Sequence, residues 1–340
     1  MPCGKCPQAL DKFAIKHTFF ETDSYDVKAD AGMMTGKSGL AGEIGLLQEA
    51  LKHDVPAILC DVTNVLRYGD VCLLGESDPY LIEVKSSARL NQRGKRQAAK
   101  LERLQEFLKT DVATNFRGNP GEVRRVSVEL EEWSHAERLN ECIGEAKANG
   151  CAIISPEPGL SYVAVYDSDG IDMSKMDHPQ GLSIYCSWND AKNIPDWAYY
   201  LPFLVTIREV EHLIDFIEGR VVILIYANTE TLTNHCSAPG WKAVFLEDGN
   251  YSVACLHVQS QGVMGLSTQM FYRVFYECVS LEWLGRSQVA AMARAWEANE
   301  TRYGPHIAID QRAHVERMLE IPYDDLMARF AAADEGPLSG

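Results

Sequence analysis

One pair of short apolar segments, separated by a turn, constrains the fold of this chain more than any other feature. Residues 69–74 and 80–86 are rich in apolar side chains, and the loop Gly75–Pro79 between them contains turn-forming glycine, serine, aspartate and proline. This pattern predicts two antiparallel strands joined as a hairpin. In such a hairpin Asp70 falls opposite residues 83–85.

Charged side chains gather at the open end of this predicted hairpin. Alternate residues of a strand point to the same side, so Glu83 and Lys85 share one face while Ile82 and Val84 occupy the other. With Asp70 on the neighbouring strand, two acids and a lysine converge on a small area. Such a group can hold a divalent cation and orient a water molecule. The alternative is a surface salt bridge between Lys85 and one of the two acids.

The order of features along the chain favours the metal site over the salt bridge. An aspartate, a turn, an apolar run, a Glu-x-Lys and then a basic helix together resemble the PD-(D/E)XK nuclease superfamily, which has the restriction-endonuclease-like fold. Asp70, Glu83 and Lys85 are the matching residues, with twelve residues between the two acids. Gly69 stands where the name of the signature has proline, which many members of the superfamily also lack. The resemblance covers roughly residues 37–130.

This resemblance implies a magnesium-dependent endonuclease or phosphodiesterase in which Mn²⁺ can substitute for Mg²⁺. It assigns Asp70 and Glu83 to the metal, with the backbone carbonyl of Val84 as a further ligand. Lys85 would orient the attacking water and stabilise charge on the phosphate. Glu43, on the preceding helix, matches a glutamate that often joins the metal site in the superfamily, where it would help to hold a second ion.

The helix expected before the hairpin gives Glu43 an unusual environment. Residues 39–52 have helical apolar spacing after Ser38, a suitable N-cap. The predicted buried stripe comprises Leu40, Ile44, Leu47 and Leu51. Glu43 lies beside this stripe, where a carboxylate is costly unless it is paired or meets a metal. The alternative is a glutamate at the boundary of the stripe whose side chain reaches water.

A second helix is predicted downstream of the hairpin, over residues 91–109. Leu101, Leu104 and Leu108 define its buried stripe, and the helical phase extends this face back to Gln97. Similar nucleases place a polar residue of this helix, often a glutamine, beside the catalytic strand, and Gln97 is the candidate here. The alternative is a glutamine at the edge of the core with satisfied hydrogen bonds.

Basic side chains cluster around the same helix, although the net charge of the chain is −16. Residues 85–125 contain 11 basic and 4 acidic side chains. The candidate nucleic-acid contacts are Arg67, Arg93, Arg96, Lys100 and Arg103. They would provide the local positive surface that a phosphate backbone requires. A solvated basic helix is the alternative interpretation.

The coarse order of elements in the first half is α-β-β-β-α-β, the order of the restriction-endonuclease-like core. It comprises a helix at 39–52, strands near 57–60, 69–74 and 80–86, a helix at 91–109 and a strand at 124–130. We therefore expect an α/β (α+β) protein with two domains. The predicted parts are an N-terminal extension 1–36, a nuclease-like domain 37–170, an acidic α/β domain 171–333 and a tail 334–340.

Composition favours a globular protein and argues against several other classes. Hydrophobic residues make up 46% of the chain and charged residues 24%, which is typical of a soluble fold. No apolar run reaches membrane-spanning length, and no signal segment is expected at the start of the chain. Ten irregularly spaced cysteines indicate reduced thiols and a cytoplasmic location. Cys3 and Cys6 form one C-x-x-C, but no second pair follows at zinc-ribbon spacing.

Together these features predict a metal-dependent nuclease that hydrolyses phosphodiester bonds, with DNA as the favoured substrate. A nuclease-like domain joined to a domain without a known motif resembles bacterial restriction and anti-phage effectors. The first alternative is a catalytically silent module of the same fold that binds nucleic acid or a protein. In the second, the acidic C-terminal half is a sensing or partner-binding domain. The sequence leaves open whether the chain forms a homo-oligomer.

Overall fold

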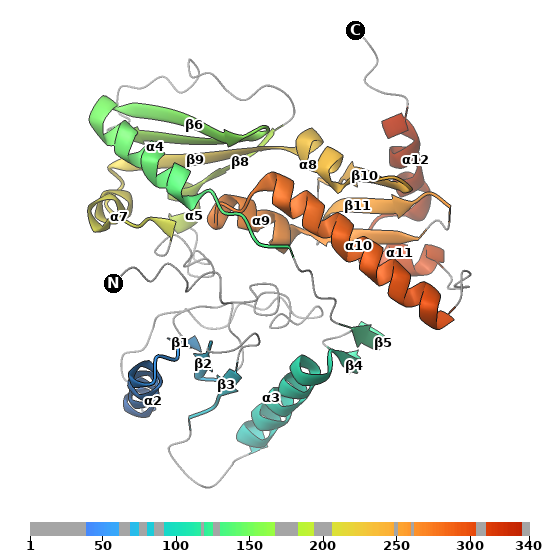
Figure 1. Ribbon diagram of the computed structural model, residues 1–340, viewed down its shortest axis with the longest axis horizontal. Helices are drawn as coiled ribbons and strands as arrows, with labels where there is room; N and C mark the ends of the chain where they lie inside the picture. Colours follow the sequence, from blue (N-terminus) through green and yellow to red (C-terminus); the bar gives the residue numbers. More distant parts are fainter. Residues whose placement is uncertain are drawn as a thin grey trace. The chain divides into compact units, whose positions relative to one another are not determined.

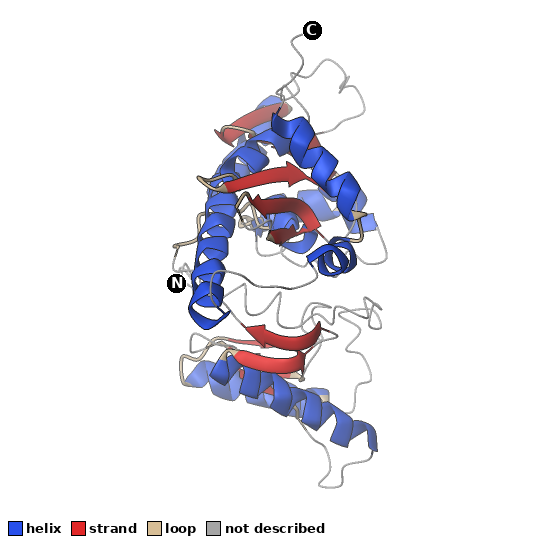
Figure 2. Ribbon diagram, turned by 90° about the vertical axis from the view of Figure 1, so that its right-hand side faces the viewer, coloured by secondary structure: helices blue, strands red, loops and turns tan. Residues whose placement is uncertain are grey.

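A computed structural model describes eleven stretches of the chain. They are residues 39–60, 69–74, 80–84, 92–116, 119–124, 130–166, 183–193, 206–247, 251–259, 262–303 and 311–334. The chain divides into two compact units, one formed by Met1–Arg125 with Lys192–Leu201 and the other by Val126–Ala191 with Pro202–Gly340. We call them unit 1 and unit 2. Both mix helices with antiparallel strands (Figure 2), which is consistent with the α+β form of the expected class.

Unit 1 begins with a helix and a three-stranded antiparallel sheet (Figure 1). Its elements are α2 (Leu40–Lys52), β1 (Ala57–Leu59), β2 (Val71–Leu73), β3 (Tyr80–Ile82), α3 (Gln92–Thr110), β4 (Val112–Phe116) and β5 (Asn119–Arg124). The sheet has the order β1-β2-β3, and Val71 pairs with Ile82 across the expected hairpin. The first five elements of the predicted order, α-β-β-β-α, are therefore confirmed for the described residues.

The end of this order differs from the expectation. A single strand at 124–130 is predicted, but the structure has a hairpin of β4 and β5 that forms its own two-stranded sheet. The hairpin begins directly after α3, because Asp111 adopts the left-handed conformation (φ 59°) that ends the helix. Residues 125–129 lie outside the described residues.

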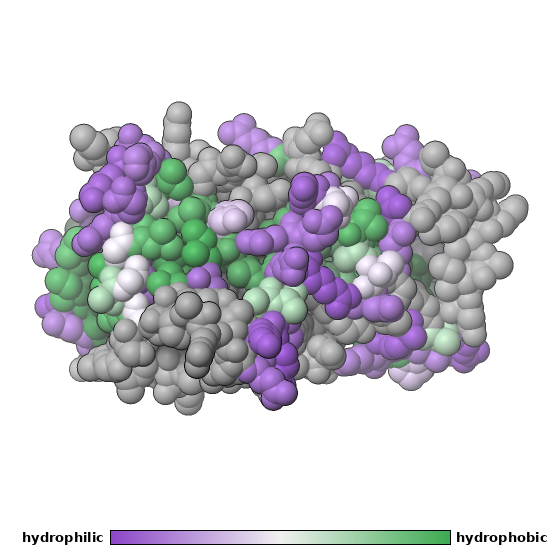
Figure 3. Space-filling view, turned by 90° about the horizontal axis from the view of Figure 1, so that it is seen from below, coloured by the Kyte–Doolittle hydropathy of each residue, from purple (hydrophilic) through white to green (hydrophobic). Residues whose placement is uncertain are grey.

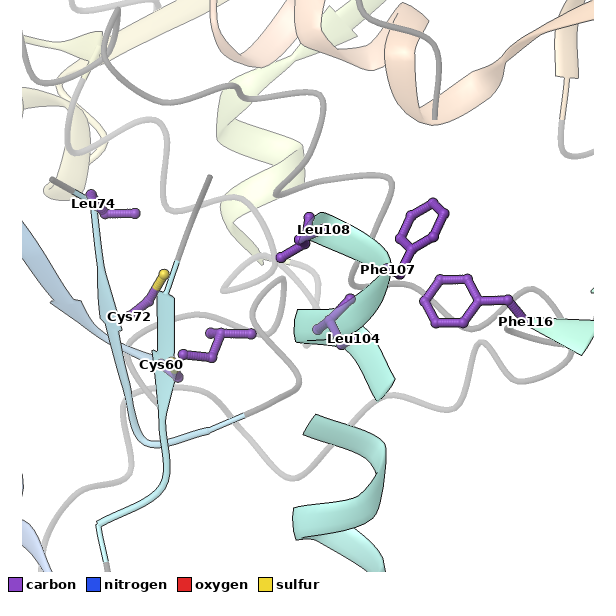
Figure 4. Close-up of a cluster of buried hydrophobic side chains, with 8 residues drawn as sticks. Cys60, Cys72, Leu74, Leu104, Phe107, Leu108 and Phe116 are labelled. Carbon is purple, nitrogen blue, oxygen red and sulfur yellow. The ribbon is translucent and has the colours of Figure 1, made fainter. Parts of the chain in front are cut away.

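The core of unit 1 lies between the three-stranded sheet and the C-terminal half of α3. Figure 4 shows this cluster, which comprises Cys60, Cys72, Leu74, Leu81, Leu104, Phe107, Leu108 and Phe116. Leu104 and Leu108 of the predicted stripe are buried, and Leu101 packs against the cluster while only partly buried. The aromatic rings of Phe107 and Phe116 lie 4.6 Å apart and attach the β4–β5 hairpin to the helix.

Unit 2 contains two further antiparallel sheets and most of the helices. Its first elements are α4 (Ala136–Asn149), β6 (Cys151–Glu157), β7 (Leu160–Tyr166), β8 (Ser183–Ser187), α5 (Trp188–Asn193, ending in unit 1), α7 (Val210–Ile217), β9 (Val221–Asn228) and α8 (Thr229–Cys236). Then follow β10 (Trp241–Phe245), β11 (Tyr251–His257), β12 (Val263–Ser267), α9 (Thr268–Tyr276), α10 (Leu281–Tyr303), α11 (Gln311–Leu319) and α12 (Tyr323–Asp334).

The predicted domain boundary near residue 170 is wrong, because a sheet joins residues on both sides of it. This sheet has the order β6-β7-β9-β8, and β7 pairs with β9 from Leu160↔Ala227 to Tyr166↔Val221. Its strand β9 contains the apolar run of residues 221–227. Residues 126–166 consequently belong to unit 2, and the N-terminal segment of unit 1 ends at Arg125.

Large apolar side chains also reach the surface, and Figure 3 shows hydrophobic side chains gathered on one face. Val210, Ile214 and Ile217, for example, are exposed along α7 of unit 2. None of the helices in the described part of the chain combines the length and the apolar character needed to cross a membrane.

Candidate active site

Asp70 is held in place by three hydrogen bonds to backbone groups of neighbouring strands. Its N–H donates to the carbonyl oxygen of Ile82 (2.8 Å), and its own carbonyl oxygen accepts from the N–H of Cys60 (2.8 Å). Oδ2 of its carboxylate accepts from the N–H of Val84 (2.8 Å). Asp70 therefore lies beside the end of β3, and the expected juxtaposition with residues 83–85 is confirmed for the described part, which ends at Val84.

Two side chains of this segment have different neighbours. Leu81 is buried in the core with α3, whereas the side chain of Val84 lies against the first turn of α2. A Cβ added to Gly42 would lie 3.1 Å from Cγ1 of Val84, so the helix and the strand approach closely. Glu83, which precedes Val84 in the sequence, is half-buried. Lys85 lies outside the described residues.

Glu43 is fully buried, with 1% of its surface exposed. The expectation that the stripe of Leu40, Ile44, Leu47 and Leu51 is buried is wrong, because Ile44 and Leu51 are 37% and 54% exposed and the other two are only partly buried. The buried residues of α2 are Glu43 and Ala50, two helical turns apart. The inner face of α2 is thus rotated towards Glu43, and the alternative of a glutamate that reaches water is excluded.

The contacts of α2 connect Glu43 with the end of the hairpin. Gly42, its neighbour in the first turn, packs against Val84, and the N–H of Val84 binds the carboxylate of Asp70. Glu43, Asp70 and Glu83 therefore belong to the same end of the β1-β2-β3 sheet. Within the described ranges, however, no three acidic, histidine or cysteine side chains form a group ready to hold a metal ion.

The chemistry of these donors fits a hard divalent cation. Asp70, Glu83 and Glu43 offer carboxylate oxygens, and the backbone of Val84 offers a carbonyl oxygen. Oxygen donors of this kind are the ligands that Mg²⁺ and Mn²⁺ prefer, whereas a structural zinc site needs thiolates or imidazoles. By donor type alone, these residues suit Mg²⁺ or Mn²⁺ better than zinc.

The glutamine that α3 places against the sheet is Gln105, not Gln97. Nε2 of Gln105 donates to the carbonyl oxygen of Leu81 (3.1 Å), while the side chain of Gln97 is exposed. The prediction of a buried Gln97 is wrong because the described core covers only the C-terminal half of α3. The position of Gln105, directly after the buried Leu104, is the sequence signal that could have identified it.

The predicted basic surface is only partly available to a ligand. Arg96 and Lys100 are exposed on α3. Arg103 is exposed as well, but its Nη2 donates to the carbonyl oxygens of Thr114 and Asn115, both at 2.5 Å. Its guanidinium also lies 5.7 Å from the ring centroid of Phe116. Arg103 thus anchors β4 to α3, which corrects its assignment as a dedicated phosphate contact. Arg67 and the side chain of Arg93 lie outside the described residues.

A groove of about 510 Å³ runs between α3 and β4. It is lined by Ala99, Glu102, Arg103, Glu106, Phe107, Val112, Ala113 and Thr114. Its two glutamates disfavour a phosphate there, and the only basic side chain that lines it is Arg103. The lining of this groove is therefore poorly suited to a phosphate group.

Comparisons with protein-family models, with curated proteins and with solved structures find no match to this chain. The functional assignment accordingly depends on the geometry of unit 1 and on the residues of the predicted motif.

Proposed function

We propose that unit 1 is a metal-dependent nuclease in which Asp70 and Glu83 hold a divalent cation. The observation that supports this most is the fixed carboxylate of Asp70, which accepts the N–H of Val84, the residue after Glu83. Backbone contacts thereby keep the two acids of the motif at neighbouring positions. A surface salt bridge would not require a carboxylate anchored in this way.

Each residue of the proposed site has a defined task. Asp70 and Glu83, with the carbonyl oxygen of Val84, orient the ion, and Glu43 adds a buried carboxylate from α2. A bound Mg²⁺ or Mn²⁺ supplies a water of lowered pKa and neutralises charge on the phosphate. Lys85 orients the attacking water and stabilises the charge that develops on the phosphate oxygens.

The proposed substrate is nucleic acid, with DNA favoured, and Arg96 and Lys100 provide its first contacts. Both side chains are exposed on α3, the helix that follows the catalytic strand in the sequence. The acidic unit 2 would then serve as a sensing or partner-binding domain. Cytoplasmic restriction or anti-phage defence is the setting that best suits such an arrangement.

Cleavage assays on the full-length chain test this proposal directly. The purified protein is incubated with plasmid DNA, linear DNA and RNA, in Mg²⁺, Mn²⁺ or EDTA. We expect cleavage with either ion and none in EDTA, and a rate lowered by about 10²-fold or more in Asp70→Asn, Glu83→Gln and Lys85→Ala. Glu102→Gln, an exposed glutamate of α3, is the matched control and should cleave like the wild type.

Two outcomes would contradict the assignment. Full activity in folded Asp70→Asn or Lys85→Ala would remove these residues from the site. Binding of nucleic acid without cleavage under any of these conditions would instead support the catalytically silent module.

A further inference from the structure

Gly69, directly before Asp70, has a backbone conformation that few other residues can adopt. Its φ is +74°, in the left-handed region that L side chains rarely occupy. Space is restricted as well, because an added Cβ would lie 3.0 Å from the carbonyl oxygen of Ile82 and 3.4 Å from its carbonyl carbon and its nitrogen. These neighbours are backbone atoms of β3 and cannot turn away. Both the dihedral angle and the close approach therefore require glycine.

The proline in the name of the signature would be incompatible with this backbone. Its ring fixes φ near −65°, on the opposite side of zero from the φ of Gly69. The chain consequently reaches Asp70 by a different backbone path from one that enters through proline. The backbone at this position therefore requires glycine and excludes proline.

The path through Gly69 determines how Asp70 meets β3. The left-handed residue brings the chain against Ile82, and the next N–H, that of Asp70, donates to the carbonyl oxygen of Ile82 (2.8 Å). With its backbone fixed there, the carboxylate of Asp70 reaches the N–H of Val84 (2.8 Å). A change of φ at Gly69 would displace the first of these bonds and, through it, the second.

We propose that Gly69 is the positioning residue for Asp70, and that its left-handed conformation holds the Asp70 carboxylate on the N–H of Val84. The catalytic consequence depends on the proposed nuclease function, because only a metal-holding Asp70 needs so fixed a carboxylate. The backbone consequence does not depend on it, so the two can be tested separately.

Amide hydrogen exchange at Val84 tests the backbone part without any nucleic acid or metal. In Gly69→Ala we expect exchange at this amide to be faster by about ten-fold, the effect of losing roughly one net hydrogen bond. Asp70→Ala removes the acceptor and should produce a similar increase. Gly150→Ala is the matched control, since Gly150 has φ +84° but no atom within 4 Å of an added Cβ. It introduces the same backbone strain in unit 2 and should leave Val84 unchanged.

A second variant distinguishes the dihedral angle from the close approach. Asparagine tolerates the left-handed region better than alanine, but it carries the same Cβ towards Ile82. Gly69→Asn should therefore recover thermal stability relative to Gly69→Ala while Val84 still exchanges faster than in the wild type. Unchanged protection of Val84 in both folded variants would overturn the proposal.

Two further measurements address the catalytic part. Mn²⁺ titration followed by electron paramagnetic resonance should show about ten-fold weaker binding in Gly69→Ala than in Gly150→Ala, the loss of about one good ligand contact. Cleavage should show a lower kcat with little change in KM for DNA.

Wild-type Mn²⁺ affinity and kcat in folded Gly69→Ala would overturn the positioning role. A wild-type protein that neither binds Mn²⁺ nor cleaves, yet loses Val84 protection in Gly69→Ala, would reject the nuclease and retain the backbone role of Gly69.

Discussion

Glu43 is the residue at which the packing of α2 departs furthest from its apolar pattern. The helix buries this carboxylate to 1% exposure, while Ile44, the next residue, is 37% exposed. Burying a charged group is costly, and an apolar residue of similar volume usually gives a more stable protein. A sequence selected for packing alone would exchange these two positions. Oε1 of Glu43 lies 3.0 Å from the position of a Cβ on Gly39, at the N-terminus of α2, so a role in that helix end and the proposed role at the metal have to be separated by experiment.

We expect Glu43→Gln to reduce cleavage without reducing stability. The amide keeps the shape of the side chain but loses the charge, so metal-dependent cleavage should fall by about 10²-fold. The free energy of unfolding should stay the same or rise, because a neutral group is easier to bury. Initial cleavage rates and urea unfolding measure the two quantities.

Glu49→Gln provides the control on the same helix, because Glu49 is exposed and pairs only with neighbouring Lys52 and His53 in the described residues. It should change stability by no more than about 0.5 kcal/mol. A Glu43→Gln protein that cleaves normally but unfolds more easily would show that the carboxylate is structural.

At the residue scale, the sequence predicted which charged residues lie close together better than it predicted which side chains are buried. The juxtaposition of Asp70 with the end of β3 follows from strand pairing, a strong constraint that the hairpin turn fixes. The environment of Gln97 could not be predicted, because helical phase alone does not say how far along α3 the core extends. The role of Gly69 was also missed, since a glycine before a motif does not reveal its dihedral angle.

Among the elements, α10 of unit 2 has an N-terminus stabilised from a distant strand. Oε1 of Glu157, at the end of β6, accepts the N–H of Leu281, and Oε2 accepts the hydroxyl of Ser280 (2.7 Å). Nε2 of His135 lies 3.4 Å from Oε2. Burial by itself would raise the pKa of Glu157, but the nearby imidazole of His135 and the hydrogen bonds from the Ser280 hydroxyl and the N–H of Leu281 outweigh it and lower the pKa. The positive end of the helix dipole favours the same charge.

This lowered pKa makes stability depend on pH in a defined direction. The folded protein binds the proton of Glu157 less tightly than the unfolded chain, so the stabilisation is fully present above the unfolded pKa. It is lost as the pH falls through the folded pKa, in the range below about pH 4. We expect the unfolding free energy of the wild type to fall across this range and that of Glu157→Gln to fall less steeply.

Urea unfolding between pH 3 and 6 measures this slope. At neutral pH Glu157→Gln should be less stable by about 2 kcal/mol, because hydrogen bonds to a charged acceptor are lost. Glu282→Gln, in the first turn of the same helix, is the control and should keep the slope of the wild type. Equal slopes in Glu157→Gln and the wild type would show that Glu157 does not contribute to acid unfolding.

At the element scale, the sequence predicted the two helices of unit 1 well, but it did not predict strand pairing between distant segments. α2 and α3 were predicted close to their observed bounds because each has a local periodic apolar pattern. The sheet that joins β7 to β9 connects residues about sixty positions apart, and no local pattern encodes such a pairing. This is why the domain boundary was placed near 170 and not at 125.

The whole molecule combines a strong negative charge with one basic segment. Residues 151–340 contain 12 basic and 25 acidic side chains, whereas residues 85–125 contain 11 basic and 4 acidic. A polyanion would be repelled by most of the chain and attracted to α3 and its surroundings. Within the described part of α3, Arg96 and Lys100 are exposed, and Arg103 binds β4. Substitutions at these three of the basic residues of α3 allow the proposed phosphate contact to be compared with structural support.

We expect binding of nucleic acid to weaken steeply with salt, because each phosphate contact releases condensed counterions. In Arg96→Gln/Lys100→Gln the affinity should fall similarly for all sequences, and the slope of log affinity against log salt should flatten by about one unit per lost contact.

Arg103→Gln is the matched control. It should lower the unfolding free energy, since β4 loses its anchor, but change the slope of log affinity against log salt little. Fluorescence anisotropy with labelled DNA across a salt series, together with thermal unfolding, measures both effects. If the basic flank instead balances acidic groups of its own chain, the double variant will lose stability and retain the wild-type slope, and α3 will not be the nucleic-acid surface.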